Sequence, residues 1–154
     1  MAESNFNNTL SQLERTLNEY FGKKASMLPP NIREIIVKIA PYLTIISLVL
    51  TLPAILLLVG LGSFATVLAP VGGMHSVSSL PTMWIGILLL IPTVILDAMA
   101  IPGLFARSIV GWRYVFWGQI ISVVANLLQF NIFGAIIGGA IGFYILFQVR
   151  SYYK

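Results

Sequence analysis

Hydrophobic positions near the start of the chain follow a helical spacing. Phe6, Leu10, Leu13, Leu17 and Tyr20 recur at steps of four, three, four and three, and Phe21 follows directly. This spacing places the six side chains on one face of an amphipathic helix within residues 1–25. A glycine and two lysines after Phe21 predict that the helix ends there. The apolar face favours docking on protein or at a membrane interface, and a solvated helix is the alternative.

Beyond residue 28 the pattern changes to long apolar stretches. The first runs without a charge from Pro41 to Gly60. At 1.5 Å per residue it gives about 30 Å of helix, the thickness of a bilayer's hydrocarbon core. A helix opening at Pro30 leads into it. Three further stretches cover residues 82–101, 112–130 and 132–147, and a tight turn at residues 129–131 separates the last two.

Glycine, proline and serine predict the breaks between the stretches. Residues 61–80 contain Gly62, Pro70, Gly72 and Gly73, which predict an interfacial loop. Pro102 and the glycine after it predict the end of the second stretch.

The pattern therefore predicts an all-α polytopic membrane protein with four transmembrane helices preceded by an N-terminal amphipathic helix. Residues 1–28 form the cytoplasmic helix and its linker, and residues 29–154 form the four-helix transmembrane domain. Composition supports this class, since 58% of the 154 residues are hydrophobic, 9% are charged and the mean hydropathy is +0.91. A soluble domain carries roughly 25% charged residues, so a soluble globular domain is excluded.

The positions of the basic residues predict the orientation. All nine lie before the first stretch, between the second and third or at the start of the third, or after the fourth: Arg15, Lys23, Lys24, Arg33, Lys38, Arg107, Arg113, Arg150 and Lys154. By the positive-inside rule both termini are cytoplasmic. A three-span reading, which fuses the last hairpin, would place Arg150 outside. The first 37 residues show no signal-peptide pattern, so we expect the first span to insert uncleaved.

The residue inventory argues against several kinds of chemistry. The chain has no cysteine, which excludes disulfides and thiolate sites. His75 is the single histidine, and no oriented acid accompanies it or the nearby serines, so neither a metal site nor a catalytic triad is expected. The net charge is +4, but the basic residues form no continuous stripe that would favour nucleic acid. We expect no enzymatic activity, no metal and no cofactor.

Asp97 is the only acidic residue in any apolar stretch. An ionisable group inside a span is costly and marks a candidate functional site. Asp97 lies about one turn or slightly more from the cytoplasmic end, where Arg107 or Arg113 could reach it. The sequence favours a structural ion pair, and a carboxylate that handles protons or cations is the alternative.

The third and fourth stretches carry complementary patterns. A polar stripe on one face of the third consists of Gln119, Ser122, Asn126 and Gln129, and a glycine row on the fourth consists of Gly134, Gly138 and Gly142. Small residues at this spacing let helices approach closely, and the amides need hydrogen-bond partners. We expect Asn126 to lie near Gly134, Ser122 near Gly138, and Gln119 near Gly142. The row alone does not distinguish packing within the chain from packing against a partner.

Three segments carry a resemblance to other proteins. IPGLFARSIVGW from Ile101, the closing LFQVRSYYK and the earlier LPPNIREIIVKIAP resemble segments of small uncharacterised bacterial four-span membrane proteins with the same ending. These motifs concern topology rather than catalysis. The resemblance implies a bacterial cytoplasmic membrane and transfers no activity and no site residues.

Together these features predict a non-enzymatic integral membrane protein that serves as an accessory, assembly or stabilising subunit of a larger membrane complex. Its expected partners are the lipid bilayer and other membrane-protein subunits, and a homo-oligomer is also compatible with the sequence. The alternative is a small oligomeric transporter or channel that uses Asp97 and the polar stripe.

Overall fold

The computed structural model describes residues 2–68 and 74–154, without the side chains of residues 2–7, 10, 65, 74–80 and 82. Every secondary-structure element in these two ranges is a helix. The predicted all-α class is therefore confirmed.

The N-terminal helix is longer than the sequence predicts. Helix α1 (Ala2–Leu17) continues into a π-helical segment, η1 (Asn18–Lys24), so the predicted end near Phe21 is wrong by one turn. The amide of Ala25 donates to the carbonyl of Tyr20 at 3.0 Å and closes the wider turn. An ion pair of 3.2 Å between Lys24 and Glu19 spans the same segment.

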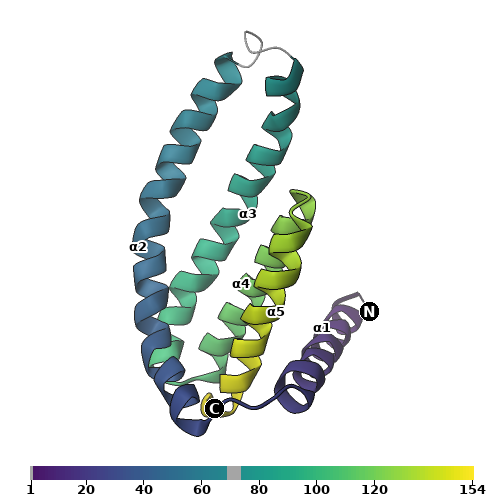
Figure 1. Ribbon diagram of the computed structural model, residues 1–154, viewed down its shortest axis with the longest axis vertical. Coiled ribbons are helices and arrows are strands. Elements are labelled where there is room, and N and C mark those ends of the chain that lie inside the picture. The colour runs from purple at the N-terminus through teal and green to yellow at the C-terminus, as the bar shows by residue number, and fades with distance from the viewer. Residues whose placement is uncertain (1, 69–73) are drawn as a thin grey trace.

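Helices α2 (Pro30–Leu68) and α3 (Met74–Phe105) form a long antiparallel hairpin (Figure 1). The predicted loop over residues 61–80 is wrong for residues 61–68 and 74–80, which are helical, and its middle, residues 69–73, lies outside the described residues. The hydroxyls of Ser63 and Thr66 donate to carbonyls four residues earlier, at 2.8 Å each, which keeps these polar side chains compatible with helix.

Helix α3 also passes the proline that was expected to stop it. Pro102 and Gly103 lie within the helix, and the amide of Ala106 donates to the Pro102 carbonyl at 3.0 Å. A proline lacks only its own N–H, and its carbonyl can still accept a hydrogen bond from an amide in the next turn. The helix consequently ends at Phe105 rather than at Ile101.

A shorter hairpin follows, made of α4 (Ile109–Leu128) and α5 (Ile132–Val149). The three residues between them are those predicted as the turn. Phe130 adopts a φ of 57°, and the side chain of Asn131 caps α5 by accepting from the Gly134 amide at 3.0 Å. A short 3-10 helix, η2 (Arg150–Tyr152), follows α5.

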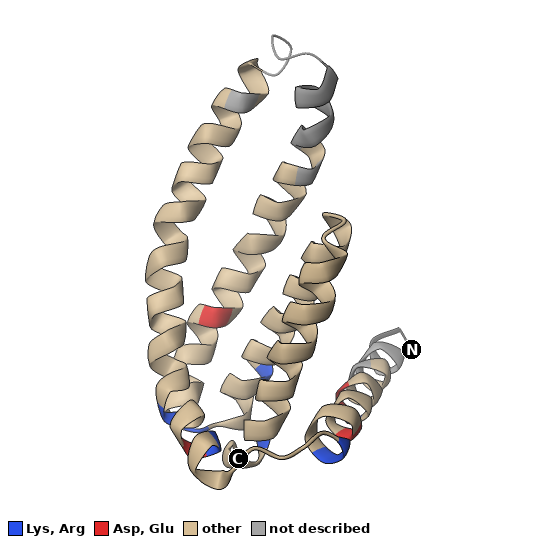
Figure 2. Cartoon of the chain, viewed as in Figure 1, with Lys and Arg blue, Asp and Glu red and all other residues tan. Residues whose placement is uncertain are grey.

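The buried core lies at one end of the bundle. Trp112 and Phe116 of α4 pack against Phe143 and Phe147 of α5, with ring centroids between 5.4 and 6.0 Å apart. The Lys and Arg residues gather at the same end, where α3 turns into α4 and where the C-terminus lies (Figure 2). The molecule therefore has a packed, charged end and a long apolar hairpin that extends from it.

Three helices in the described ranges are long and apolar enough to cross a membrane, within Pro30–Leu68, Met83–Phe105 and Ile132–Tyr152. They indicate a membrane protein. Helix α4 has 20 residues but is not one of the three, because Arg113, Gln119 and Asn126 make it more polar.

Candidate functional site

The last residue of the chain closes onto the turn between α3 and α4. The Lys154 amide donates to the Arg107 carbonyl at 3.0 Å, and the Ile109 amide donates to the Lys154 carbonyl at 2.9 Å. Arg107 adopts a φ of 50°, and Ser108 caps α4 by accepting from the Val110 amide. The turn and the C-terminus thus form one hydrogen-bonded unit.

Two glycines let α3 and α4 cross in backbone contact. A Cβ atom built on Gly103 would lie 2.5 Å from the Cα of Gly111, and a Cβ on Gly111 would lie 2.5 Å from the carbonyl carbon of Gly103. Real Cβ atoms do not approach this closely, so only glycine fits at either position.

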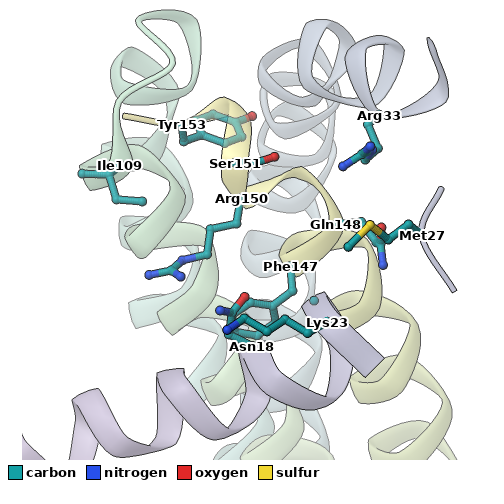
Figure 3. Close-up of a pocket in the computed structure, with 11 residues that line it drawn as sticks. Asn18, Lys23, Met27, Arg33, Ile109, Phe147, Gln148, Arg150, Ser151 and Tyr153 are labelled. Atoms are coloured by element: carbon teal, nitrogen blue, oxygen red, sulfur yellow. The ribbon is translucent and has the colours of Figure 1, made fainter. Parts of the chain in front are cut away.

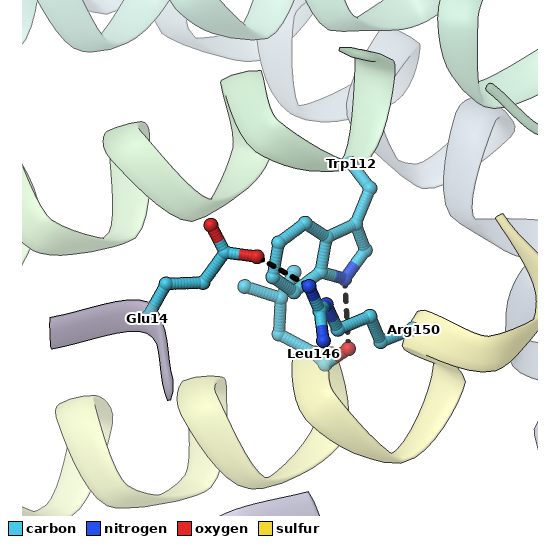
Figure 4. Close-up of polar contacts among 4 residues, drawn as sticks. All are labelled: Glu14, Trp112, Leu146 and Arg150. Atoms are coloured by element: carbon cyan, nitrogen blue, oxygen red, sulfur yellow. Dashed lines mark hydrogen bonds and ion pairs between the residues drawn. The ribbon is translucent and has the colours of Figure 1, made fainter. Parts of the chain in front are cut away.

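Arg150 joins the N-terminal helix to the core (Figure 4). Its guanidinium forms an ion pair of 2.5 Å with Glu14 of α1 and lies 5.3 Å from the ring centroid of Trp112. The Trp112 indole N–H donates to the Leu146 carbonyl at 2.9 Å. A charge pair and a stacked cation therefore fix the end of α5 between α1 and α4.

Gln148 holds the segment that follows η1. Its side chain is buried, with only 3% of its surface exposed. The amide nitrogen donates to the carbonyls of Phe21 and Ser26, and the amide oxygen accepts from the Leu28 amide at 3.1 Å. The Tyr144 hydroxyl also donates to Ser26, at 2.6 Å.

The three segments that carry the resemblance thus meet in space. Residues 101–112 form the glycine crossing and the turn, residues 146–154 supply Gln148 and Arg150, and residues 28–41 begin α2. The Tyr152 hydroxyl donates to the Pro30 carbonyl at 3.3 Å, and the Arg33 guanidinium lies 5.9 Å from the Tyr152 ring centroid. Sequence reasoning treated these segments as topological signals and missed that they form one site.

Two cavities adjoin this meeting point. The first, here called the cationic pocket, has a volume of about 440 Å³, and its lining includes Lys23, Arg33, Gln148, Arg150, Ser151 and Tyr153 (Figure 3). The second, here called the apolar groove, has a volume of about 420 Å³ and lies between α2, α4 and α5. Its lining includes Ile36, Ile39, Leu43, Val115, Ile145 and Tyr153.

Tyr153 lines both cavities and is itself buried. Burial raises the pKa of its hydroxyl above the ordinary value, and the positive charge of Arg107 offsets part of the rise. The phenol is therefore neutral at physiological pH, and it adds no negative charge to the cationic pocket.

The predicted ion pair of Asp97 does not form. The ion pairs among the described residues join Lys24 to Glu19, Lys38 to Glu34 and Arg150 to Glu14, so neither Arg107 nor Arg113 pairs with Asp97. The carboxylate instead faces α4, where a Cβ atom on Gly118 would lie 3.5 Å from it. Arg107 is exposed in the turn that follows α3.

The polar stripe and the glycine row come together in part. A Cβ atom on Gly134 would meet Asn126, and one on Gly142 would meet Gln119, so these two expected pairs are neighbours. The Gln119 amide donates to the Gly138 carbonyl at 3.1 Å. Gly138 itself is exposed, and a Cβ there would meet nothing within 4 Å. A side chain at position 138 would therefore not contact Ser122, and the expected match in depth between Ser122 and Gly138 stays a prediction.

The seam between α4 and α5 instead uses Gly139, which is buried and faces Val123. Gln129 donates to the Ala125 carbonyl of its own helix, and its side chain approaches Gly86 of α3. Residues of the polar stripe thus contact two different helices, α5 and α3. Their spacing in the sequence shows only that they share one face of α4 and does not show which helix each contacts.

The apolar face of the N-terminal helix packs only in part against the rest of the chain. Leu17 and Phe21 pack on the core, with the Phe21 ring centroid 6.3 Å from that of Phe143. Leu13 and Tyr20 are exposed. The side chains of Phe6, Leu10 and His75 lie outside those that the structure describes.

The described residues contain no group of three or more His, Cys, Asp or Glu side chains that could hold a metal ion. The site offers instead cations, amides and an aromatic core, which suit binding and docking. Comparison of the chain with protein-family models, with curated proteins and with solved structures gave no match.

Proposed function

We propose that the chain is a non-enzymatic, four-span protein of the bacterial cytoplasmic membrane that acts as an accessory, assembly or stabilising subunit of a larger membrane complex. The residues that the structure describes supply packing surfaces and cations, which support this proposal. Both termini lie on the cytoplasmic side, and α1 with η1 docks there as an amphipathic helix.

The fourth span in this proposal is α4. Its 20 residues correspond to about 30 Å of helix. Two of its polar side chains have hydrogen-bond partners, since the Gln119 amide donates to the Gly138 carbonyl of α5 and the Asn126 amide donates to the Ser122 carbonyl of α4. The gathering of Lys and Arg at one end of the bundle supports the orientation.

The observation that carries the proposal is the length of the α2–α3 hairpin. From residue 39 to Leu68, α2 has no charge over about 45 Å of helix. A hydrocarbon core is about 30 Å thick, and submerging the whole stretch would need a tilt near 50°, beyond the usual range of about 0–40°. The hairpin also reaches past the end of α4 and α5 (Figure 1).

The excess length carries exposed apolar side chains. With Pro41–Gly60 in the hydrocarbon, residues 61–68 at the C-terminal end of α2 extend about two turns beyond it. We call these residues the hairpin extension. Leu61, Phe64, Val67 and Leu68 are all exposed on it, Phe64 at 70% and Val67 at 76%. Leaving this surface in water costs free energy that burial against a partner recovers.

The helices of the hairpin are also poorly covered by the chain itself. Of the most apolar stretch of α2 only 6% is buried inside the molecule, against 39% for the span in α5. The proposed occupant of the hairpin extension is the apolar surface of another membrane protein, which contacts it on the non-cytoplasmic side.

Site-specific photo-crosslinking in the native membrane tests this proposal. A photoreactive residue at Phe64 is expected to give a discrete adduct with a different membrane protein. The same residue at Ile137, an exposed position of α5, serves as the matched control and is expected to react with lipid. Adducts with lipid alone at both positions would overturn the proposal, and adducts only with a second copy of this chain would replace it by a homo-oligomer.

A small transporter or channel is the second candidate. A cavity of about 190 Å³ between α3 and α4, lined in part by Thr93, Ser122 and Asn126, favours it. Asp97 is not among the residues that line this cavity. A proton or cation flux in liposomes that Asn126→Leu abolishes would select this candidate over the first.

A further inference from the structure

The cationic pocket collects positive side chains from three parts of the chain. Lys23 comes from η1, Arg33 from the first turns of α2, and Arg150 from η2 (Figure 3). No carboxylate is among the described residues that line it. Docking of η1 against the end of α5 therefore brings together cations that the sequence keeps far apart.

These cations are incompletely neutralised. Within the described part of the chain, Arg150 pairs with Glu14, whereas Lys23 and Arg33 have no ion-pair partner. The Nε atoms of Arg33 and Arg150 are buried, and no described residue accepts a hydrogen bond from either. These two Nε atoms lie out of reach of a ligand in the pocket, but an anion with several oxygens would neutralise the charges of Lys23 and Arg33, beside which no described lining residue is a carboxylate.

The apolar groove adjoins the pocket on the side of the hydrocarbon. Tyr153 lines both cavities, and Arg33 of the pocket precedes Ile36 of the groove by one turn of α2. From Ile35 to Thr44 the groove follows α2 for about 13 Å. Its lining is apolar except for Thr44, Gln119 and Tyr153, as an acyl chain requires.

We propose that this pair of cavities is a binding site for an anionic phospholipid. The phosphate oxygens accept from Arg33 and Lys23 in the cationic pocket, Arg150 adds positive charge to its lining, and one acyl chain lies in the apolar groove. A basic pocket at the cytoplasmic end of transmembrane helices has the position and charge that lipid headgroups need. A free phosphate would fill only the pocket and leave the groove unused.

Native mass spectrometry of the full chain, purified in detergent and stripped of lipid, tests the assignment. Phosphatidylglycerol is expected to remain bound where phosphatidylcholine with the same acyl chains does not. Arg33→Gln is expected to weaken retention about fivefold. Lys23→Gln should weaken it similarly, and since Lys23 is exposed this variant carries little risk of misfolding.

Lys38→Gln is the matched control, because Lys38 lies on the same helix, is exposed and pairs with Glu34 outside the pocket. It should retain phosphatidylglycerol like the wild type. Equal retention of both lipids, or unchanged retention in both pocket variants, would overturn the proposal. Displacement of the lipid by millimolar inorganic phosphate would also overturn it and leave a small-anion site.

Discussion

At the scale of single residues, a few polar side chains decide how the two ends of the chain come together. Gln148 satisfies three backbone groups of residues 21–28, and Arg150 links α1 to the aromatic core. The sequence shows Gln148 only as one polar residue near the end of an apolar stretch. Its partners lie more than 100 residues away along the chain, so no local pattern could identify them.

Gln148→Leu should release the N-terminal segment. The substitution leaves the Leu28 amide and the Phe21 carbonyl without partners, and we expect a loss of about 2–3 kcal/mol in folding stability. Thermal melting in detergent and faster tryptic cleavage at Lys23 and Lys24 measure the two effects. Gln129→Leu is the control, since Gln129 bonds only within its own helix. Equal behaviour of the two variants would refute the role given to Gln148.

Asp97→Asn should leave the stability unchanged or raise it by up to about 1 kcal/mol. The described structure gives Asp97 no ion-pair partner, so the substitution removes a charge from an apolar helix without breaking a pair. Thermal melting of the purified variant measures this. A loss greater than about 1 kcal/mol would show that Arg107 or Arg113 reaches the carboxylate after all.

At the scale of helices, periodicity and hydropathy locate the elements but not all of their ends. The turn at residues 129–131 was predictable because polar residues interrupt an apolar run. Of the loop expected over residues 61–80, residues 61–68 and 74–80 are helical, and the hydroxyls of Ser63 and Thr66 bond to earlier carbonyls within the helix. The crossing of Gly103 and Gly111 was also missed, since the glycine row on α5 offered a more regular pattern.

Gly111→Ala should disrupt the crossing of α3 and α4. The new methyl group would meet backbone rather than a movable side chain, so we expect a loss of more than about 3 kcal/mol. Gly138→Ala is the matched control and should fold normally, because its methyl group enters open space. Detergent melting curves of the two variants compare them directly. If Gly138→Ala lowers the melting temperature and Gly111→Ala does not, the close helix contact lies at Gly138 rather than at Gly111.

At the scale of the whole molecule, the distribution of charge and the length of the hairpin govern the arrangement. The segregation of Lys and Arg was visible in the sequence, because the positive-inside rule needs only their positions along the chain. The hairpin extension was not, since it depends on how far α2 continues past Gly60. The cationic pocket was equally hidden, as its side chains come from both ends of the chain.

Labelling of single cysteines in this cysteine-free chain checks the topology. His75→Cys should react with a membrane-impermeant maleimide in intact cells, because the proposed topology places residue 75, at the start of α3, on the outer side. Lys24→Cys, at the charged end, should react only after permeabilisation. The opposite pattern would invert the orientation and place the hairpin extension in the cytoplasm.

The most direct test of the accessory-subunit account is the size and composition of the particle that holds the chain in mild detergent. The wild type is expected to migrate well above its 16.9 kDa monomer, with a second membrane protein at fixed stoichiometry. Phe64→Glu with Val67→Glu should release it as a folded small particle, and Ile137→Ser should not. A wild-type chain that migrates alone, with the same size as the double variant, would contradict the account.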